Sequence, residues 1–196
     1  MQSEKIIERI VSWLKDYAEK AGVKGYVIGV SGGVDSGVVS TLCAMTGLKV
    51  LALEMPIRQQ KDQASRALEH IDFLKNKFPN VEGFTVDLNE PFEALYKTFD
   101  VKDDEFPAEK LAFANTRSRL RMLTLYYYGQ INGLLVCGTG NKVEDFGIGF
   151  YTKYGDGGVD VSPIADLYKT EVYALARALD LPESIKNAIP TDGLWD

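Results

Sequence analysis

A glycine-rich hexapeptide, Ser31-Gly-Gly-Val-Asp-Ser36, combines residue types that suit the binding of a phosphate group. Its two adjacent glycines let the backbone approach a ligand closely and take positive φ angles. Its two serine hydroxyls can donate hydrogen bonds, and Asp35 can hold Mg²⁺ against phosphate oxygens. A helical pattern follows, and the first turn of a helix presents unpaired N–H groups and a partial charge of about +0.5. The hexapeptide is therefore predicted to be an anion-binding loop.

The elements that must position this loop alternate between short apolar runs and amphipathic stripes. The apolar runs, which we interpret as strands, are residues 25–30, 49–53, 83–87 and 133–137. The stripes, which we interpret as helices, are residues 4–20, 38–45, 61–76, 107–131 and a segment that follows Lys169. This alternation predicts an α/β fold in which a parallel sheet carries helices on both faces. Ser31–Ser36 and Gly138–Glu144 each follow a predicted strand, at the sheet edge where such folds bind ligands.

The glycines around Ser31 are compatible with other kinds of site as well. A Walker A loop needs Gly-Lys-Ser/Thr and a dinucleotide-binding loop needs GxGxxG, and the chain contains neither. Gly29-Val-Ser31-Gly-Gly33 fits the GxSxG elbow of α/β-hydrolases, in which Ser31 would be the nucleophile and His70 its base. A purely structural glycine turn is the other alternative. Outside the hydrolase interpretation, His70 is expected to be an ordinary surface or half-buried helix residue.

Composition and charge exclude several classes of protein. The net charge of −6 and the pI near 4.9 argue against nucleic acid as the main partner. The single histidine excludes an HExxH zinc site, and the chain has no run of eighteen apolar residues that would span a membrane. Cys43 and Cys137 form no CxxC pair and no secretory signal is visible, so we expect a cytoplasmic protein with reduced thiols. Residues 1–196 are expected to form a single domain.

The hexapeptide, at the end of a predicted strand, resembles the pyrophosphate loop of the ATP pyrophosphatase (PP-loop) superfamily. This superfamily includes NAD, GMP, asparagine and argininosuccinate synthetases and tRNA-thiolation enzymes. The resemblance implies a Rossmann-like fold of the adenine nucleotide alpha hydrolase-like type. It also implies cleavage of ATP between the α and β phosphates, a step that all these enzymes share. The loop alone does not choose the group that ATP activates.

Four further segments resemble the NAD synthetase family when they are taken together. They are Asn115–Met122, Gly138–Glu144, Tyr151–Asp160 and Leu167–Val172, and Thr-Lys-Tyr-Gly-Asp-Gly-Gly within the third is the most diagnostic. The resemblance implies a homodimeric carbon–nitrogen ligase that amidates deamido-NAD to NAD with ammonia. ATP would activate the substrate as an acyl-adenylate, with release of AMP and pyrophosphate. The alternatives are another PP-loop amidotransferase or synthetase, and a non-catalytic nucleotide-binding module.

Carried over position by position, the family resemblance implies roles for individual residues. The residues expected to bind ATP are Gly29, Val30, Ser31, Gly32, Gly33, Val34, Asp35, Ser36, Thr139, Lys169 and Thr191. Those expected to bind deamido-NAD are Arg119, Lys153 and Asp160. Asp35 and Glu144 are expected to bind Mg²⁺, since two carboxylates from separate loops can share a hard cation that bridges phosphates. The residues expected to act in catalysis are Asp35, Lys169 and Asp156.

The chain departs from the family pattern in two places. The segment Glu144–Lys153 is one residue longer than the family spacing, which leaves the local register around Glu144 open. The chain stops at Asp196, whereas family members continue with a substrate-covering loop and a terminal helix, so we expect it to lack that segment. The 28 residues before Gly29 are too few for an attached glutaminase domain. Free ammonia is therefore the expected nitrogen source, and a separate glutaminase subunit is possible but not indicated.

Overall fold

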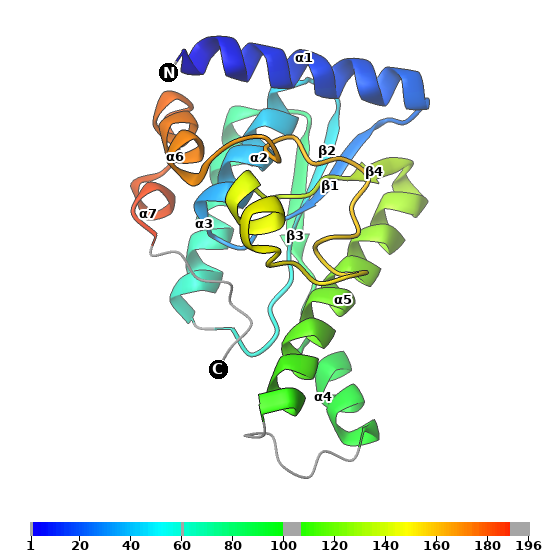
Figure 1. The fold of residues 1–196 in the computed structure, drawn as a ribbon. Helices are drawn as coiled ribbons and strands as arrows, with labels where there is room; N and C mark the ends of the chain where they lie inside the picture. The colour runs from blue at the N-terminus through cyan, green and yellow to red at the C-terminus, as the bar shows by residue number, and fades with distance from the viewer. Residues whose placement is uncertain (1, 60, 100–106, 189–196) are drawn as a thin grey trace.

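The computed structural model describes residues 2–59, 61–99 and 107–188, and within them a parallel sheet runs through the centre of the molecule (Figure 1). The strands of these residues are β1 (Gly25–Gly29), β2 (Lys49–Glu54), β3 (Val81–Thr85) and β4 (Leu134–Val136), in the order β3-β2-β1-β4. All pairings are parallel, as predicted. The third strand begins two residues before its predicted start, because Val81 is buried and pairs with Val50.

Helices connect the strands and follow the predicted stripes closely. The helices are α1 (Ser3–Ala21), α2 (Val34–Met45), α3 (Lys61–Lys77), α4 (Asn89–Thr98), α5 (Pro107–Asn132), the π-helix η1 (Lys142–Ile148), α6 (Lys169–Ala178) and α7 (Glu183–Lys186). The elements α4, η1 and α7 have no counterpart among those predicted from periodicity. No helix within the described residues has both the length and the apolar character needed to cross a bilayer.

Alternating side chains along β1 build a hydrophobic core on each face of the sheet. Tyr26 and Ile28 face one side and belong to a buried cluster that includes residues of α1, α2 and α6. Val27 faces the other side and belongs to a second cluster with Leu125 of α5. Figure 1 shows these two groups of helices on opposite sides of the sheet. The predicted α/β architecture with helices on both faces is confirmed.

The carboxyl edge of the sheet gathers segments that lie far apart in the sequence. The chain leaves β1 at Gly29 and enters α2 at Val34, so the glycine-rich loop sits at this edge. Just beyond β4, Cys137 forms a parallel bridge with Val161, which holds the segment before α6 against the sheet. The backbone N–H of Lys142 donates to the carbonyl of Leu167 at 3.0 Å and ties the start of η1 to the same segment. These contacts bring the first turns of α2, η1 and α6 together.

Candidate functional site

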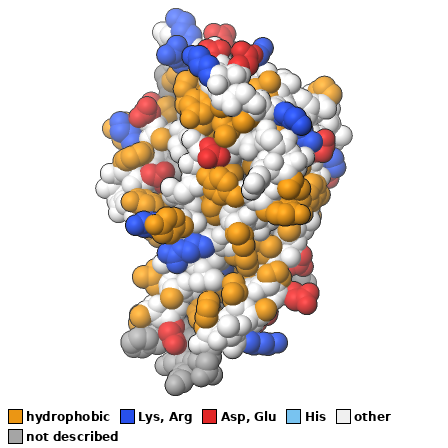
Figure 2. Space-filling model, turned by 90° about the vertical axis from the view of Figure 1, so that its right-hand side faces the viewer, with side chains coloured by type: hydrophobic (Ala, Val, Ile, Leu, Met, Phe, Trp, Pro, Cys, Tyr) orange, Lys and Arg blue, Asp and Glu red, His pale blue; other side chains and the backbone are white. Residues whose placement is uncertain are grey.

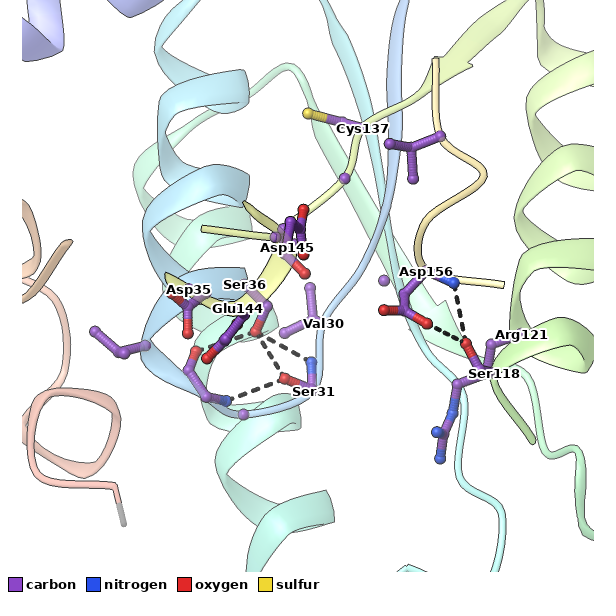
Figure 3. Close-up of a pocket in the computed structure, with 18 of the residues that line it drawn as sticks. Val30, Ser31, Asp35, Ser36, Ser118, Arg121, Cys137, Glu144, Asp145 and Asp156 are labelled. Carbon is purple, nitrogen blue, oxygen red and sulfur yellow. Dashed lines mark hydrogen bonds between the residues drawn. The ribbon is translucent and has the colours of Figure 1, made fainter. Parts of the chain in front are cut away.

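A cavity of about 570 Å³ opens at the carboxyl edge of β1 and β4. All eight residues from Gly29 to Ser36 line it, as do Gly138–Gly140, Glu144, Asp156 and Lys169. Figure 3 shows the glycine-rich loop on one side of this cavity and residues of α5 on the other. The site therefore lies where the strand–loop–helix pattern predicted it.

The glycine-rich loop is held closed by its own serines. The Ser36 hydroxyl accepts from the backbone N–H of Ser31 at 3.2 Å, lies 3.1 Å from the Ser31 hydroxyl, and donates to the Gly33 carbonyl at 3.0 Å. Gly32 has a φ of 80°, in the region that favours glycine. Gly33 is the N-cap of α2 and makes no side-chain cap, so the first N–H groups of the helix remain available for an anion.

Lys169 joins two carboxylates that come from different elements. Its ammonium forms an ion pair with Asp35 of α2 and lies 3.0 Å from Oε1 of Glu144 in η1. The side-chain amide of Asn141 donates to the other oxygen of Asp35 at 3.1 Å. Burial by itself lowers the pKa of the Lys169 ammonium, but Asp35 and Glu144 outweigh it and raise that pKa above its usual value. Lys169 therefore stays charged at neutral pH.

Two of these three residues, Asp35 and Glu144, supply some of the ligands that a divalent cation site needs. Asp35 and Glu144 direct hard oxygen ligands at one point, which the Lys169 ammonium takes in this structure. No group of three or more His, Cys, Asp or Glu side chains that could hold a metal occurs among the residues the structure describes. Mg²⁺ commonly binds through one or two carboxylates plus phosphates and water, so the two carboxylates fit a site completed by a nucleotide.

Asp156 lies on the opposite wall and is fixed by three hydrogen bonds. Its carboxylate accepts from the Ser118 hydroxyl at 2.6 Å and from the backbone N–H of Thr152 at 3.0 Å. Its own N–H donates to Ser118 Oγ at 3.0 Å. Figure 3 shows Asp156 and Ser118 together, across the cavity from Ser31. The wall opposite the glycine-rich loop thus carries a carboxylate of its own, well separated in the chain from Asp35.

The residues expected to contact deamido-NAD do not line the cavity. Arg119 is exposed, and its Nε donates to the carbonyl of Lys153 at 3.1 Å. The Asp160 carboxylate accepts from the backbone N–H of Val136 at 2.8 Å and from the Tyr126 hydroxyl at 3.0 Å. All three lie around the solvent side of α5, and their role toward the dinucleotide stays a prediction. Thr191, expected to bind ATP, lies outside the described residues.

Sequence reasoning overlooked several residues that line the cavity. They are Gln59, Arg66, Ser118, Arg121 and Asp145. Helical spacing was the available signal for two of them, because residues 118, 121, 122 and 125 fall on one face of α5 whereas 119, 123 and 127 fall on another. The pKa of Asp145 is raised to about 6, by burial first and then by Asp156, Glu144 and Asp35.

His70 differs from its expected place, and this removes the hydrolase interpretation. The residue is completely buried, not at the surface, and its Nε2 lies 2.9 Å from the Ser40 hydroxyl in the middle of α2. The Ser31 hydroxyl contacts Ser36 and the Gly33 N–H instead. Ser31 and His70 therefore do not form the serine–histidine pair that a nucleophile elbow requires.

A comparison with known protein families decides among the remaining alternatives. The family model described as NAD synthase matches residues 6–196. The chain belongs to the NAD synthase family. Membership identifies it as an enzyme, a carbon–nitrogen ligase, and confirms the resemblance found in its motifs. The interpretations as another PP-loop enzyme or as a non-catalytic module are set aside.

Individual members of the NAD synthase family match along nearly the whole chain. NH(3)-dependent NAD(+) synthetases from Finegoldia magna and Carboxydothermus hydrogenoformans are 39% and 41% identical, over 100% and 98% of this chain and 77% of each relative. A solved NMN synthetase from Francisella tularensis has a TM-score of 0.88 and 34% identity, covering 100% of this chain and 78% of that one. An NH3-dependent NAD synthetase from Campylobacter jejuni, in complex with nitrate, has a TM-score of 0.83 and 33% identity, covering 95% and 77%.

Proposed function

We propose that this protein makes NAD from deamido-NAD, with ATP and ammonia as co-substrates. The observation that carries the proposal is the convergence of Asp35, Glu144 and Lys169 on the glycine-rich loop of an NAD synthase-family chain. A carboxylate is a poor acyl electrophile, so the nicotinate carboxylate first attacks the α-phosphorus of ATP. The new C–O–P bond forms as the α–β phosphoanhydride breaks and pyrophosphate leaves. Ammonia then attacks the acyl carbon, loses a proton, and displaces AMP.

The glycine-rich loop is the part we assign to the ATP phosphates. Backbone N–H groups at the start of α2 and the Ser31 and Ser36 hydroxyls supply donors on one wall of the cavity. The Lys169 ammonium is a point charge that can move from the carboxylates to a phosphate oxygen. Gly29, Val30 and Thr139 complete this wall in the proposal. Catalysis then rests on positioning two substrates and neutralising phosphate charge.

Asp35 and Glu144 would hold Mg²⁺, which supplies charge neutralisation for the phosphates when it is bound. Asp156 has a different role in the proposal, because it lies on the opposite wall and is held by Ser118. A fixed carboxylate there can orient the incoming ammonia by accepting a hydrogen bond. It can also take the proton that ammonia loses after attack on the acyl carbon.

A second copy of the chain is proposed to complete the acceptor site. Leu123, Tyr127 and Ile131 are spaced four residues apart on α5, and each is at least 60% exposed. Figure 2 looks onto this side of the molecule, where hydrophobic side chains gather. Arg119 and Lys153 flank the same helix face. Packing of two copies across this stripe would enclose these cations, and deamido-NAD would bind between the subunits.

We further infer that the protein works in a reducing compartment, the cytoplasm. Cys43 and Cys137 are free and buried, with their sulfur atoms 3.5 Å apart. Such a close unbonded pair suits a compartment where thiols stay reduced.

The experiment that tests the reaction measures pyrophosphate release with ATP, Mg²⁺ and ammonium, with and without deamido-NAD. We expect release that depends on deamido-NAD and equals the NAD formed. Because one similar structure is described as an NMN synthetase, a parallel arm supplies nicotinate mononucleotide. Faster amidation of the mononucleotide would overturn the choice of acceptor, and absence of any acceptor-dependent release would overturn the reaction. Glutamine replaces ammonium in a third arm, where we expect no turnover.

A further inference from the structure

Arg121 lines the cavity on the wall that faces the glycine-rich loop. It follows Ser118 by one turn of α5 and lies on the same helix face. Figure 3 shows its side chain extending from α5 beside Ser118, on the other side of the cavity from Ser31. Neither the reaction steps above nor the family motifs give this residue a role.

Within the described part of the chain, the hydrogen-bond partners of the Arg121 guanidinium are neutral groups. Its Nε donates to the carbonyl of Met55 at 3.1 Å, and one terminal nitrogen donates to Oε1 of Gln59 at 3.4 Å. Across the described ranges of the chain, no carboxylate forms an ion pair with it. The anchoring fixes one edge of the planar group and leaves the remaining N–H donors for another partner.

The surroundings of Arg121 disfavour its positive charge. Burial is the main reason that its pKa falls to about 10, and the neighbouring Arg117 lowers that pKa further. Glu54 acts in the opposite direction, but its carboxylate accepts a hydrogen bond from Thr85 at 2.6 Å. Arg121 is half-buried and has no ion pair with a carboxylate among the described residues, so an anion bound in the cavity would offset the cost of its partial burial.

Cations and carboxylates both line the cavity. Asp35 and Glu144 lie with Lys169 beside the glycine-rich loop, whereas Arg121 lies across the cavity, on the wall that also carries Asp156. A phosphate that approaches the acidic side needs a cation as intermediary, but Arg121 can receive a phosphate oxygen directly. Arginine suits this task because its donors match the spacing of phosphate oxygens.

We propose that Arg121 binds a phosphate group of one of the two nucleotides through the guanidinium edge that Met55 leaves open. The two sources of that chemistry are the polyphosphate of ATP and the diphosphate of the dinucleotide acceptor. The identity of these nucleotides rests on the proposed function, whereas the anion site itself rests on the charge and position of Arg121.

The test is direct titration calorimetry of the full chain with four ligands: inorganic pyrophosphate, ATP, AMP and deamido-NAD. The variant is Arg121→Gln. Its matched control is Arg58→Gln, which removes the same charge just after β2 but breaks a surface pair with Glu93 outside the cavity. We expect R121Q to weaken one ligand class about 10- to 100-fold, the usual effect of losing a charge-assisted hydrogen bond. R58Q is expected to stay within twofold of the unmodified protein.

The ligand that weakens identifies the source. Loss with pyrophosphate and ATP but not AMP assigns Arg121 to the ATP polyphosphate, and loss with deamido-NAD alone assigns it to the acceptor. Unchanged affinity for all four overturns the proposal. If R121Q does not fold, the variant Arg121→Lys replaces it, because lysine keeps the positive charge but not the planar pair of donors. We expect this variant to lose about three- to tenfold in affinity, and unchanged affinity again overturns the proposal. Binding is measured without turnover, so a wrong reaction and a wrong anion site give separate results.

Discussion

Lowering the pH should destabilise this protein through His70 in particular. This imidazole, on α3, is completely buried against α2 and stacks on Phe73 with ring centroids 5.7 Å apart. Nε2 contacts the Ser40 hydroxyl, and Nδ1 has no hydrogen-bond partner among the described residues. Burial lowers the pKa of His70 from 6.5 to about 4, so the folded protein keeps the ring neutral.

The sign and size of the effect follow from the two pKa values. The unfolded chain binds a proton near pH 6.5 and the folded chain only near pH 4, so stability falls as the pH drops through that interval. Between pH 7 and pH 5 the loss from this one group is about 2 kcal/mol, within a ceiling of about 3 kcal/mol. Asp145 acts in the opposite direction, since its raised pKa means that the folded state takes up a proton first.

The assay is urea unfolding at pH 7, 6 and 5, for the unmodified protein and for His70→Gln. Glutamine can donate the same hydrogen bond to Ser40 but does not titrate, so the difference between the two curves removes Asp145 and every other group. We expect the unfolding free energy of the unmodified protein, relative to that of the variant, to fall by about 2 kcal/mol as the pH falls from 7 to 5. A constant difference across the three pH values would falsify the reasoning, because it would mean that folding leaves the titration of His70 unchanged.

Three further perturbations test the site itself. Asp35→Asn removes a carboxylate proposed to hold Mg²⁺ and should lower kcat at least about 100-fold in steady-state kinetics. Its effect on the Kd for deamido-NAD, measured by calorimetry, should be smaller. Gly32→Ala places a side chain at a φ of 80°, so it should lower the free energy of unfolding by about 1 kcal/mol and raise the KM for ATP. An unchanged KM would mean that the loop does not contact the nucleotide. Ser118→Ala removes one of the two hydrogen bonds to the Asp156 carboxylate and should lower kcat/KM for ammonium about tenfold while KM for ATP is retained. An equal change in kcat/KM for ammonium and in KM for ATP would count against an ammonia-orienting role.

Local sequence predicted the parts of the fold that are made from neighbouring residues. β1, the glycine-rich loop and α2 are contiguous, so their apolar run, glycines and helical stripe are legible without tertiary information. The meeting of Asp35, Glu144 and Lys169 depends on three elements, of which α2 lies more than a hundred residues before η1 and α6. The hydrophobic period of a single element carries no information about this meeting, and only the family resemblance indicated it.

Three features show why the remainder could not be predicted. Glu144 lies within a π-helix, whose wider turns have no distinct hydrophobic period to detect. His70 sits on α3 at a position whose burial depends on α2 packing across it, which a single helical stripe does not reveal. Arg119 and Lys153 are assigned to a ligand by resemblance alone, and in this structure both are exposed, with Arg119 on α5 and its Nε bonded to the Lys153 carbonyl.

The ion pair between Lys169 and Asp35 gives this carboxylate an internal counterion. A free divalent cation must displace that ammonium before it can use both carboxylates, and the displaced charge then lacks a partner. In the proposed function a nucleotide would remove this obstacle, because its phosphates would receive the lysine while the carboxylates received the metal. Metal affinity and nucleotide affinity would thereby be coupled, and each would raise the other by the same factor. The protein should therefore bind Mg²⁺ weakly alone and much more tightly as the nucleotide complex, which keeps the site from filling before the substrate arrives.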